Sequence, residues 1–183
     1  MVGSFVRLAA AAAFSAALAG CSSAPDSVYP HYRPDSQASM TKGRLPIECV
    51  PFARERSGID IHGDAYTWWD RAEGRYRRSS SPSAGAVMVL SGYAGSKRAH
   101  VAVVRRVVSA REIRVDHANW LNNGAIYLDD PVADISPDND WSQVLVWNVE
   151  TGAWGVHVYD VQGFIGPAGK ANPTVAQTAA PID

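Results

Sequence analysis

The sequence lacks the features that would indicate a nucleic-acid-binding, repeat or metal-dependent protein. Its 17 basic and 18 acidic residues leave a net charge of −1 at pH 7, which gives no sign of a nucleic-acid partner. It contains no internal repeat. No pair of histidines or cysteines has the short spacing of zinc ligands, and the acidic run Asp138-Asn139-Asp140 is too short for a calcium loop. We therefore expect no cofactor, and a required metal is the weakest alternative.

The chain begins with a targeting segment over residues 1–20. One basic residue, Arg7, precedes an apolar run over 8–18 that is too short for an ordinary membrane-spanning helix and has the form of a secretory signal. The segment ends in Leu18-Ala19-Gly20-Cys21, which resembles the signal of bacterial lipoproteins. The resemblance implies lipidation of the Cys21 sulfur, cleavage before Cys21 and anchoring to a lipid membrane. Ser22 follows, which in Gram-negative lipoproteins implies transfer to the outer membrane, facing the periplasm.

The second cysteine, Cys49, is predicted to be a lone free thiol. The sequence holds only two cysteines, so lipidation of Cys21 would leave Cys49 without a disulfide partner. A free thiol is at risk in an oxidising compartment. We therefore expect a protein that keeps one there to use it.

Cys49 also stands where a helix is predicted to begin. Pro51 fits the first turn of a helix, and Ser57-Gly58 is a stop signal. A thiol at a helix N-terminus faces unpaired N–H groups and the positive end of the helix dipole, which favour the nucleophilic thiolate. We therefore interpret Cys49 as a nucleophile. The alternative is a buried cysteine that packs as a small hydrophobe.

Composition divides the remaining chain into three parts. Residues 21–42 are rich in Pro, Ser, Tyr and Asp without apolar periodicity and are expected to form a flexible tether. Residues 43–165 are long enough for one domain with a core of its own. Residues 166–183 are rich in Ala, Pro and Gly and are expected to be disordered.

The pattern within residues 43–165 predicts an α+β domain. A second helix is expected from Asp64 to about Ala72, and its tryptophans, Trp68 included, either pack on the first helix or line a cleft. Residues 129–140 are expected to form an acidic loop. Strands are predicted at 86–90, 99–108, 112–120, 125–128, 144–149 and 156–161. The expected fold is two N-terminal helices packed on an antiparallel sheet of about five strands.

Two of the predicted strands bring polar side chains together. His100 opens one strand, and His117 and Asn119 share one face near the end of the next. Because a short turn joins these strands, antiparallel pairing places His100 beside His117 and Asn119. Cys49, His100 and one of these polar residues would form a catalytic set of nucleophile, base and orienting group. Either His117 or Asn119 could hold the His100 ring in one tautomer.

These segments resemble the CHAP domain, the family of cysteine, histidine-dependent amidohydrolases and peptidases. The matching pieces, over about residues 43–120, are 48–53, 63–65 with Trp68, 82–89, 99–104 and 115–120. The resemblance implies a papain-like fold, related to that of NlpC-type peptidases, and cleavage of peptidoglycan. The enzyme would be an N-acetylmuramoyl-L-alanine amidase or an endopeptidase of the stem peptide or cross-bridge. Cys49 would be the nucleophile of a thioester mechanism and His100 the base.

The third position departs from the family pattern. Many members have an acid two residues before the Asn-Trp pair, where this chain has His117, whereas Asn119 matches the family's asparagine. Histidine serves at this position in NlpC-type peptidases, so both candidates stay open. Trp68 and Trp120 lie in matching segments and are expected to line the substrate cleft. A non-catalytic peptidoglycan-binding or scaffolding lipoprotein is the alternative function, and restraint by a regulatory protein is expected if the protein cuts the wall.

Overall fold

The computed structural model describes residues 30, 33–92, 95 and 97–167. The predicted signal segment 1–20, the lipidation site Cys21 and nearly all of the tail predicted at 166–183 lie outside these residues. Among the described residues, no helix is both long and apolar enough to cross a membrane.

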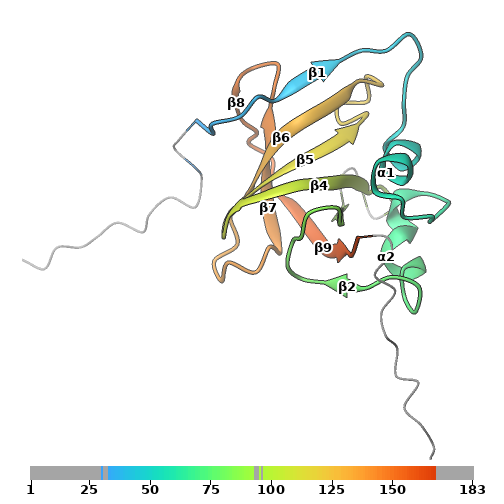
Figure 1. The fold of residues 1–183 in the computed structure, drawn as a ribbon. Coiled ribbons are helices and arrows are strands. Elements are labelled where there is room, and N and C mark those ends of the chain that lie inside the picture. Colours follow the sequence, from blue (N-terminus) through green and yellow to red (C-terminus); the bar gives the residue numbers. More distant parts are fainter. Residues whose placement is uncertain (1–29, 31–32, 93–94, 96, 168–183) are drawn as a thin grey trace, which may run out of the picture.

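The described residues form one antiparallel sheet that closes on itself. Its path runs β6-β5-β4-β3-β9-β7, and β7 pairs back with β6, which makes a barrel of six strands (Figure 1). The short strands β1, β2 and β8 pair with β6, β9 and β7 at its margins. The strands are β1 (Ser39–Thr41), β2 (Arg78–Ser79), β3 (Val87–Ser91), β4 (His100–Ser109), β5 (Glu112–Ala118), β6 (Ile126–Asp134), β7 (Gln143–Asn148), β8 (Ala153–Trp154) and β9 (Tyr159–Ile165).

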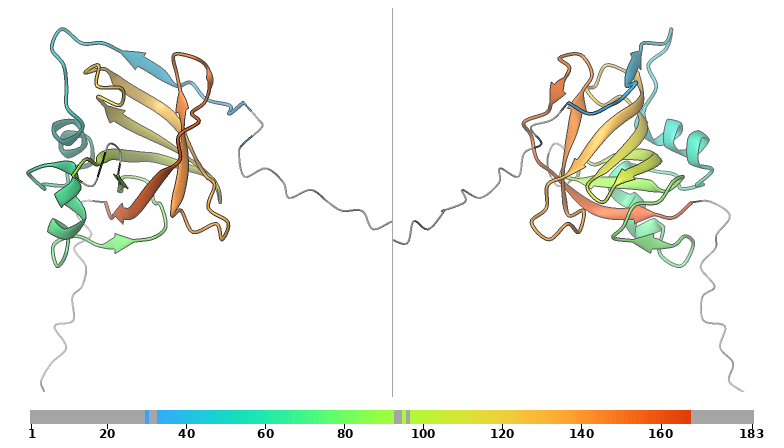
Figure 2. Two further views of the ribbon diagram at one scale, coloured as in Figure 1. Left: turned by 180° about the vertical axis from the view of Figure 1, so that it is seen from behind. Right: turned by 60° about the vertical axis from the view of Figure 1, so that its left-hand side comes forward.

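The helices are few and lie together on one side of the barrel. They are α1 (Cys49–Ser57), the 3₁₀ turn η1 (Ala65–Thr67) and α2 (Trp68–Arg71). Both views of Figure 2 place them opposite the β7–β8 hairpin. The first helix is as predicted and ends at Gly58, whose φ of 73° provides the left-handed cap. The second predicted helix is shorter than expected, because most of its first turn is 3₁₀.

The strands β3 and β4 separate two cores. On β3, Met88 and Leu90 point into the barrel, whereas Val87 and Val89 pack under the helices. On β4, His100, Ala102 and Val104 face the barrel interior. Burial on both faces explains why these strands are continuous apolar runs instead of alternating ones.

The predicted architecture of helices on a sheet of about five strands is therefore only partly correct. The fold is mostly β because the predicted acidic loop over 129–140 begins as a strand: β6 continues to Asp134 and pairs with both β5 and β7. The predicted last strand is displaced, and β9 begins at Tyr159.

The segment predicted as a tether over 21–42 also contributes to the domain. Its end forms β1, which pairs with β6, and Ser36 donates a hydrogen bond to the Asp129 carbonyl at 2.9 Å. A three-residue strand leaves no readable alternation in a polar segment, and it is held here by an edge that only the folded sheet provides.

Candidate active site

The sequence-predicted nucleophile, Cys49, is the first residue of α1. Glu48 precedes it in an extended conformation and accepts the Phe52 N–H at 3.3 Å, which begins the helix. Because Pro51 has no N–H, the unpaired amides of the first turn belong to Cys49 and Val50. The thiol is half-buried and is the one free cysteine among the described residues.

Cys49 and the sequence-predicted base, His100, line the same cleft. The cleft has a volume of about 630 Å³ and lies between the start of α1, the segment before η1 and the ends of β4 and β5. Acidic and basic side chains both border it. Its lining residues are Glu48, Cys49, Val50, Pro51, Gly63, Asp64, Ala65, Tyr66, Lys97, Arg98, Ala99, His100, Asn119 and Asn122.

Behind the cleft, a line of hydrogen bonds enters the barrel from His100. The His100 Nε2 lies 2.9 Å from the His117 Nδ1, and the His117 Nε2 lies 3.0 Å from Oδ2 of Asp130. The exposed fractions of the three side chains are 3%, 1% and 0%. Hairpin pairing of β4 with β5 therefore brings His100 and His117 together as the sequence predicted. Asp130 was missed, because it fell in the predicted acidic loop.

A bulge in β6 aims Asp130 at His117. Val115 pairs with Asp130 and His117 pairs with Tyr127, so one residue of β5 faces two of β6. Asp129 takes a φ of 54° within this irregularity. The extra residue shifts the inward and outward alternation of the β6 side chains by one position. As a result, Tyr127 and Asp130 both point into the barrel and contact His117.

Asn119, the other candidate for the third position, is used differently. Its Nδ2 donates to Glu48 Oε2 at 2.8 Å, and its Oδ1 accepts the Gly124 N–H at 2.8 Å. Its backbone has a φ of 59°, a conformation that asparagine tolerates. Asn119 borders the cleft and fixes the residue before Cys49, whereas His117 is the side chain that bonds to His100.

The two tryptophans predicted to line the cleft lie in the interior instead. Trp68 is fully buried under α1 among the apolar side chains of β3 and β4. Trp120 is 5% exposed, and its ring centroid lies 4.8 Å from that of His100 and 5.4 Å from that of His117. The cleft assignment is therefore wrong for both. Trp120 packs against the two buried imidazoles.

Burial governs the titration of the site. It raises the pKa of the Cys49 thiol; the Val101 N–H lowers that pKa, the Glu48 carboxylate raises it, and the N–H groups of Val50 and Cys49 lower it. Burial, together with neighbouring His117, holds the pKa of His100 well below its usual range. The helix start was expected to favour the thiolate, but burial opposes it, and a neutral thiol and a neutral imidazole are favoured at neutral pH.

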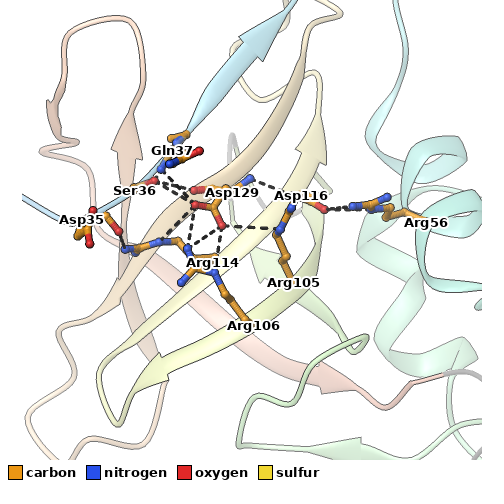
Figure 3. A network of polar contacts seen from close by, with 10 residues as sticks. Asp35, Ser36, Gln37, Arg56, Arg105, Arg106, Arg114, Asp116 and Asp129 are labelled. Carbon is orange, nitrogen blue, oxygen red and sulfur yellow. Dashed lines mark hydrogen bonds and ion pairs between the residues drawn. The ribbon is translucent and has the colours of Figure 1, made fainter.

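A second polar network on the outside of the barrel holds α1 in position (Figure 3). Arg56 of α1 bonds to the Asp116 carboxylate on β5 at 2.6 and 2.9 Å, and Asp116 also accepts the N–H of Asp129 at 2.9 Å. Arg105 and Arg106 add ion pairs to Asp116 and Asp129, respectively. As alternation predicts, Asp116 faces outward while His117 faces the interior.

The two other histidines among the described residues have ordinary surroundings. His62 is exposed and pairs with Asp60 at 2.9 Å, and His157 packs on Tyr159. Within the part of the chain that the structure describes, no three His, Cys, Asp or Glu side chains gather as metal ligands would.

Residues 40–119 match the family model of the CHAP domain, and the chain therefore contains a CHAP domain. The match includes Cys49, His100, His117 and Asn119 and ends before the strand that carries Asp130. CHAP domains are usually amidases or peptidases, which supports assignment to the hydrolases and suggests peptidoglycan as the substrate class. No curated protein and no solved structure is significantly similar to the chain.

Proposed function

We propose that the protein is a cysteine hydrolase that cleaves an amide bond of peptidoglycan. The observation that carries the proposal is the cleft shared by Cys49 and His100, in which the His100 ring is held from behind by His117. A thiol, an imidazole and an orienting polar group are the parts that acyl transfer through a thioester requires.

The reaction would begin with proton transfer inside the cleft. Because His100 Nε2 bonds to His117, the thiol proton would pass to His100 Nδ1 as Sγ bonds to the carbonyl carbon. The carbonyl electron pair moves to oxygen, where the N–H groups of Cys49 and Val50 stabilise it. Loss of one such donor typically costs about 3 kcal/mol.

The second half of the reaction restores the thiol. Collapse of the intermediate breaks the C–N bond, and the amine leaves with the proton from His100, which gives a thioester on Cys49. Water then attacks the thioester with His100 again as base. The acyl group leaves as a carboxylic acid, and Cys49 recovers its proton.

Location follows from the N-terminal signal. We propose that acylated Cys21 anchors the protein to the outer membrane and that the domain faces the periplasm, where peptidoglycan lies. The bond is either the N-acetylmuramoyl-L-alanine amide or an amide of the stem peptide or cross-bridge. The alternative function is non-catalytic binding or scaffolding on the same fold.

Mass spectrometry of muropeptides tests the proposal. Sacculi are incubated with the full-length protein in detergent and, in parallel, with its Cys49→Ala form. Free stem peptides with intact glycan are expected from an amidase, and shortened or uncrosslinked stems from an endopeptidase; neither is expected from Cys49→Ala. Equal release by both forms would contradict cysteine catalysis. No release by either form, with binding to sacculi retained in both, would favour the binding function.

A further inference from the structure

The third position of this site is an imidazole, yet a carboxylate stands directly behind it. His100, His117 and Asp130 come from three adjacent strands, and the two hydrogen bonds between them measure 2.9 and 3.0 Å. Building on the proposed function, we infer that Asp130 is a positioning residue for catalysis, which acts on His100 through His117.

The hydrogen bonds fix the proton on each ring. An ionised carboxylate only accepts, so His117 must donate to Asp130 from Nε2. A neutral imidazole has one donor and one acceptor, so Nδ1 of His117 accepts the Nε2–H of His100. His100 is thereby left with an unprotonated Nδ1. Asp130 selects the tautomer that a general base at the cleft needs.

The charge of Asp130 matters most during the reaction. Because the resting thiol and imidazole are neutral, proton transfer creates a cation on His100 inside an apolar barrel, where an unpaired charge is costly. The Nε2–H of that cation points through His117 toward the carboxylate. The ionised Asp130 therefore stabilises the pair of Cys49 thiolate and His100 cation more than the pair of neutral thiol and neutral imidazole. A neutral His117 without the carboxylate would stabilise the charged pair less.

The surroundings of Asp130 argue against a purely structural role. It is fully buried, and Oδ1 has no hydrogen-bond partner among the described residues. Burial raises its pKa, the bonded His117 and the nearby Arg114 lower it, and adjacent Asp129 raises it. A buried carboxylate with one side-chain hydrogen bond costs folding stability, so asparagine should fold at least as well.

The first test is iodoacetamide alkylation of Cys49 across pH in the full-length protein. Asp130→Asn removes the negative charge whichever way the amide is turned. It should slow alkylation at pH 7 by about tenfold. This is the effect expected if loss of the charge makes proton transfer from Cys49 to His100 less favourable by one pKa unit. At high pH, where the thiol ionises without His100, the rates should converge. Asp134→Asn makes the same change in another buried acid of β6 and should match the wild type.

A double-mutant cycle shows whether the effect passes through His117. In His117→Asn, the amide oxygen can lie near the position of Nδ1 and still accept from His100, but the link to Asp130 is cut. This variant should show the same loss as Asp130→Asn, and the two together should lose no more. Moving the carboxylate, in His117→Asp combined with Asp130→Asn, should restore neutral-pH alkylation. If Asp130→Asn does not fold, the His117→Asn profile decides alone.

The outcomes separate this inference from the proposed function. Muropeptide release by Asp130→Asn should fall on the order of 100-fold, as for loss of general-base support. Normal alkylation and release in Asp130→Asn would overturn the role of Asp130 and leave the hydrolase proposal intact. If the wild-type protein releases no muropeptides but Asp130→Asn still shows the pH-dependent alkylation defect, the result would support the role of Asp130 and overturn the proposed substrate. If Asp130→Asn slowed Cys49 alkylation equally at every pH, the inference would also be overturned. Additive losses of His117→Asn and Asp130→Asn in the double-mutant cycle would do the same.

Discussion

Arg56 joins the helix that begins at Cys49 to the strand that carries His117, because it bonds to Asp116, the residue just before that histidine. Asp116 is 1% exposed, whereas the Arg56 side chain is about half exposed. The ion pair therefore acts less as a source of stability than as a fixed link between the two halves of the site.

Replacement of Asp116 should disturb both stability and activity. Asp116→Ala leaves the Asp129 N–H without its acceptor at the β6 bulge, at an expected cost of about 1–3 kcal/mol. Arg56→Ala removes only the exposed partner and should cost less than about 1 kcal/mol. Chemical denaturation measures both, with muropeptide release assayed on folded protein. Equal destabilisation by the two variants would contradict the central role of Asp116.

A comparison of Asn119→Gly with His117→Ala tests the choice of third residue. Glycine adopts the positive φ of position 119 without strain, so the variant removes only the amide contacts to Glu48 and Gly124. We expect it to keep at least a tenth of wild-type release, which corresponds to a loss below about 1.4 kcal/mol. His117→Ala removes the partner of His100 and should lose far more of the muropeptide release. The release is compared per folded molecule, and circular dichroism gives the folded fraction of each variant. The reverse ranking would assign the third position to Asn119.

The pH dependence of activity should reflect the burial of His100. Because its pKa is held well below the usual range, the base stays neutral in mildly acidic solution. The acid limb of muropeptide release should therefore lie below pH 6.5, the ordinary histidine value. An acid limb at or above that value would contradict a buried neutral base.

Stability should follow the same group with a defined sign. Below about pH 6.5 the unfolded chain protonates His100 before the folded chain does, so the unfolded state binds more protons. The free energy of unfolding should fall as pH decreases from there toward the lowered folded-state pKa. His100→Gln removes this contribution, and its stability should fall less over that interval in thermal melts at several pH values.

Local patterns in the sequence were sufficient to predict the part of the site formed by Cys49, His100 and His117. The helix start at Cys49 follows from Pro51 and Gly58, and the meeting of His100 with His117 follows from two strands joined by a short turn. Both are short-range features of the chain. The family match covers this same part.

The position of Asp130 behind His117 depends on contacts that no local pattern reveals. Asp130 faces His117 only because Asp129 forms a bulge, and the sequence Asp129-Asp130-Pro131 has the composition of a loop. Pairing of β6 with β7 closes the barrel. The pattern of residues in these two strands does not indicate that they pair with each other. Trp68 illustrates the other difficulty: a tryptophan in a short helix can line a cleft or fill a core, and only packing decides.

Gly124 fixes the segment that leads into Cys49, and replacing it should damage the site. Its φ is 66°, and a Cβ there would lie 2.4 Å from the Cβ of Pro46. Its carbonyl also accepts the Ile47 N–H at 3.2 Å. Gly124→Ala must therefore push Pro46 away, at a cost of about 1–3 kcal/mol for overpacking in addition to the backbone strain.

Gly74→Ala provides the matched control. Its φ of 69° is nearly the same, but no atom lies within 4 Å of an added Cβ. It should carry the strain alone, about 1–2 kcal/mol, with muropeptide release unchanged. Chemical denaturation should find Gly124→Ala the less stable variant, and Cys49 alkylation should be altered only there. Equal behaviour of the two would mean that Pro46 yields freely and that its contact with Gly124 does not position Cys49.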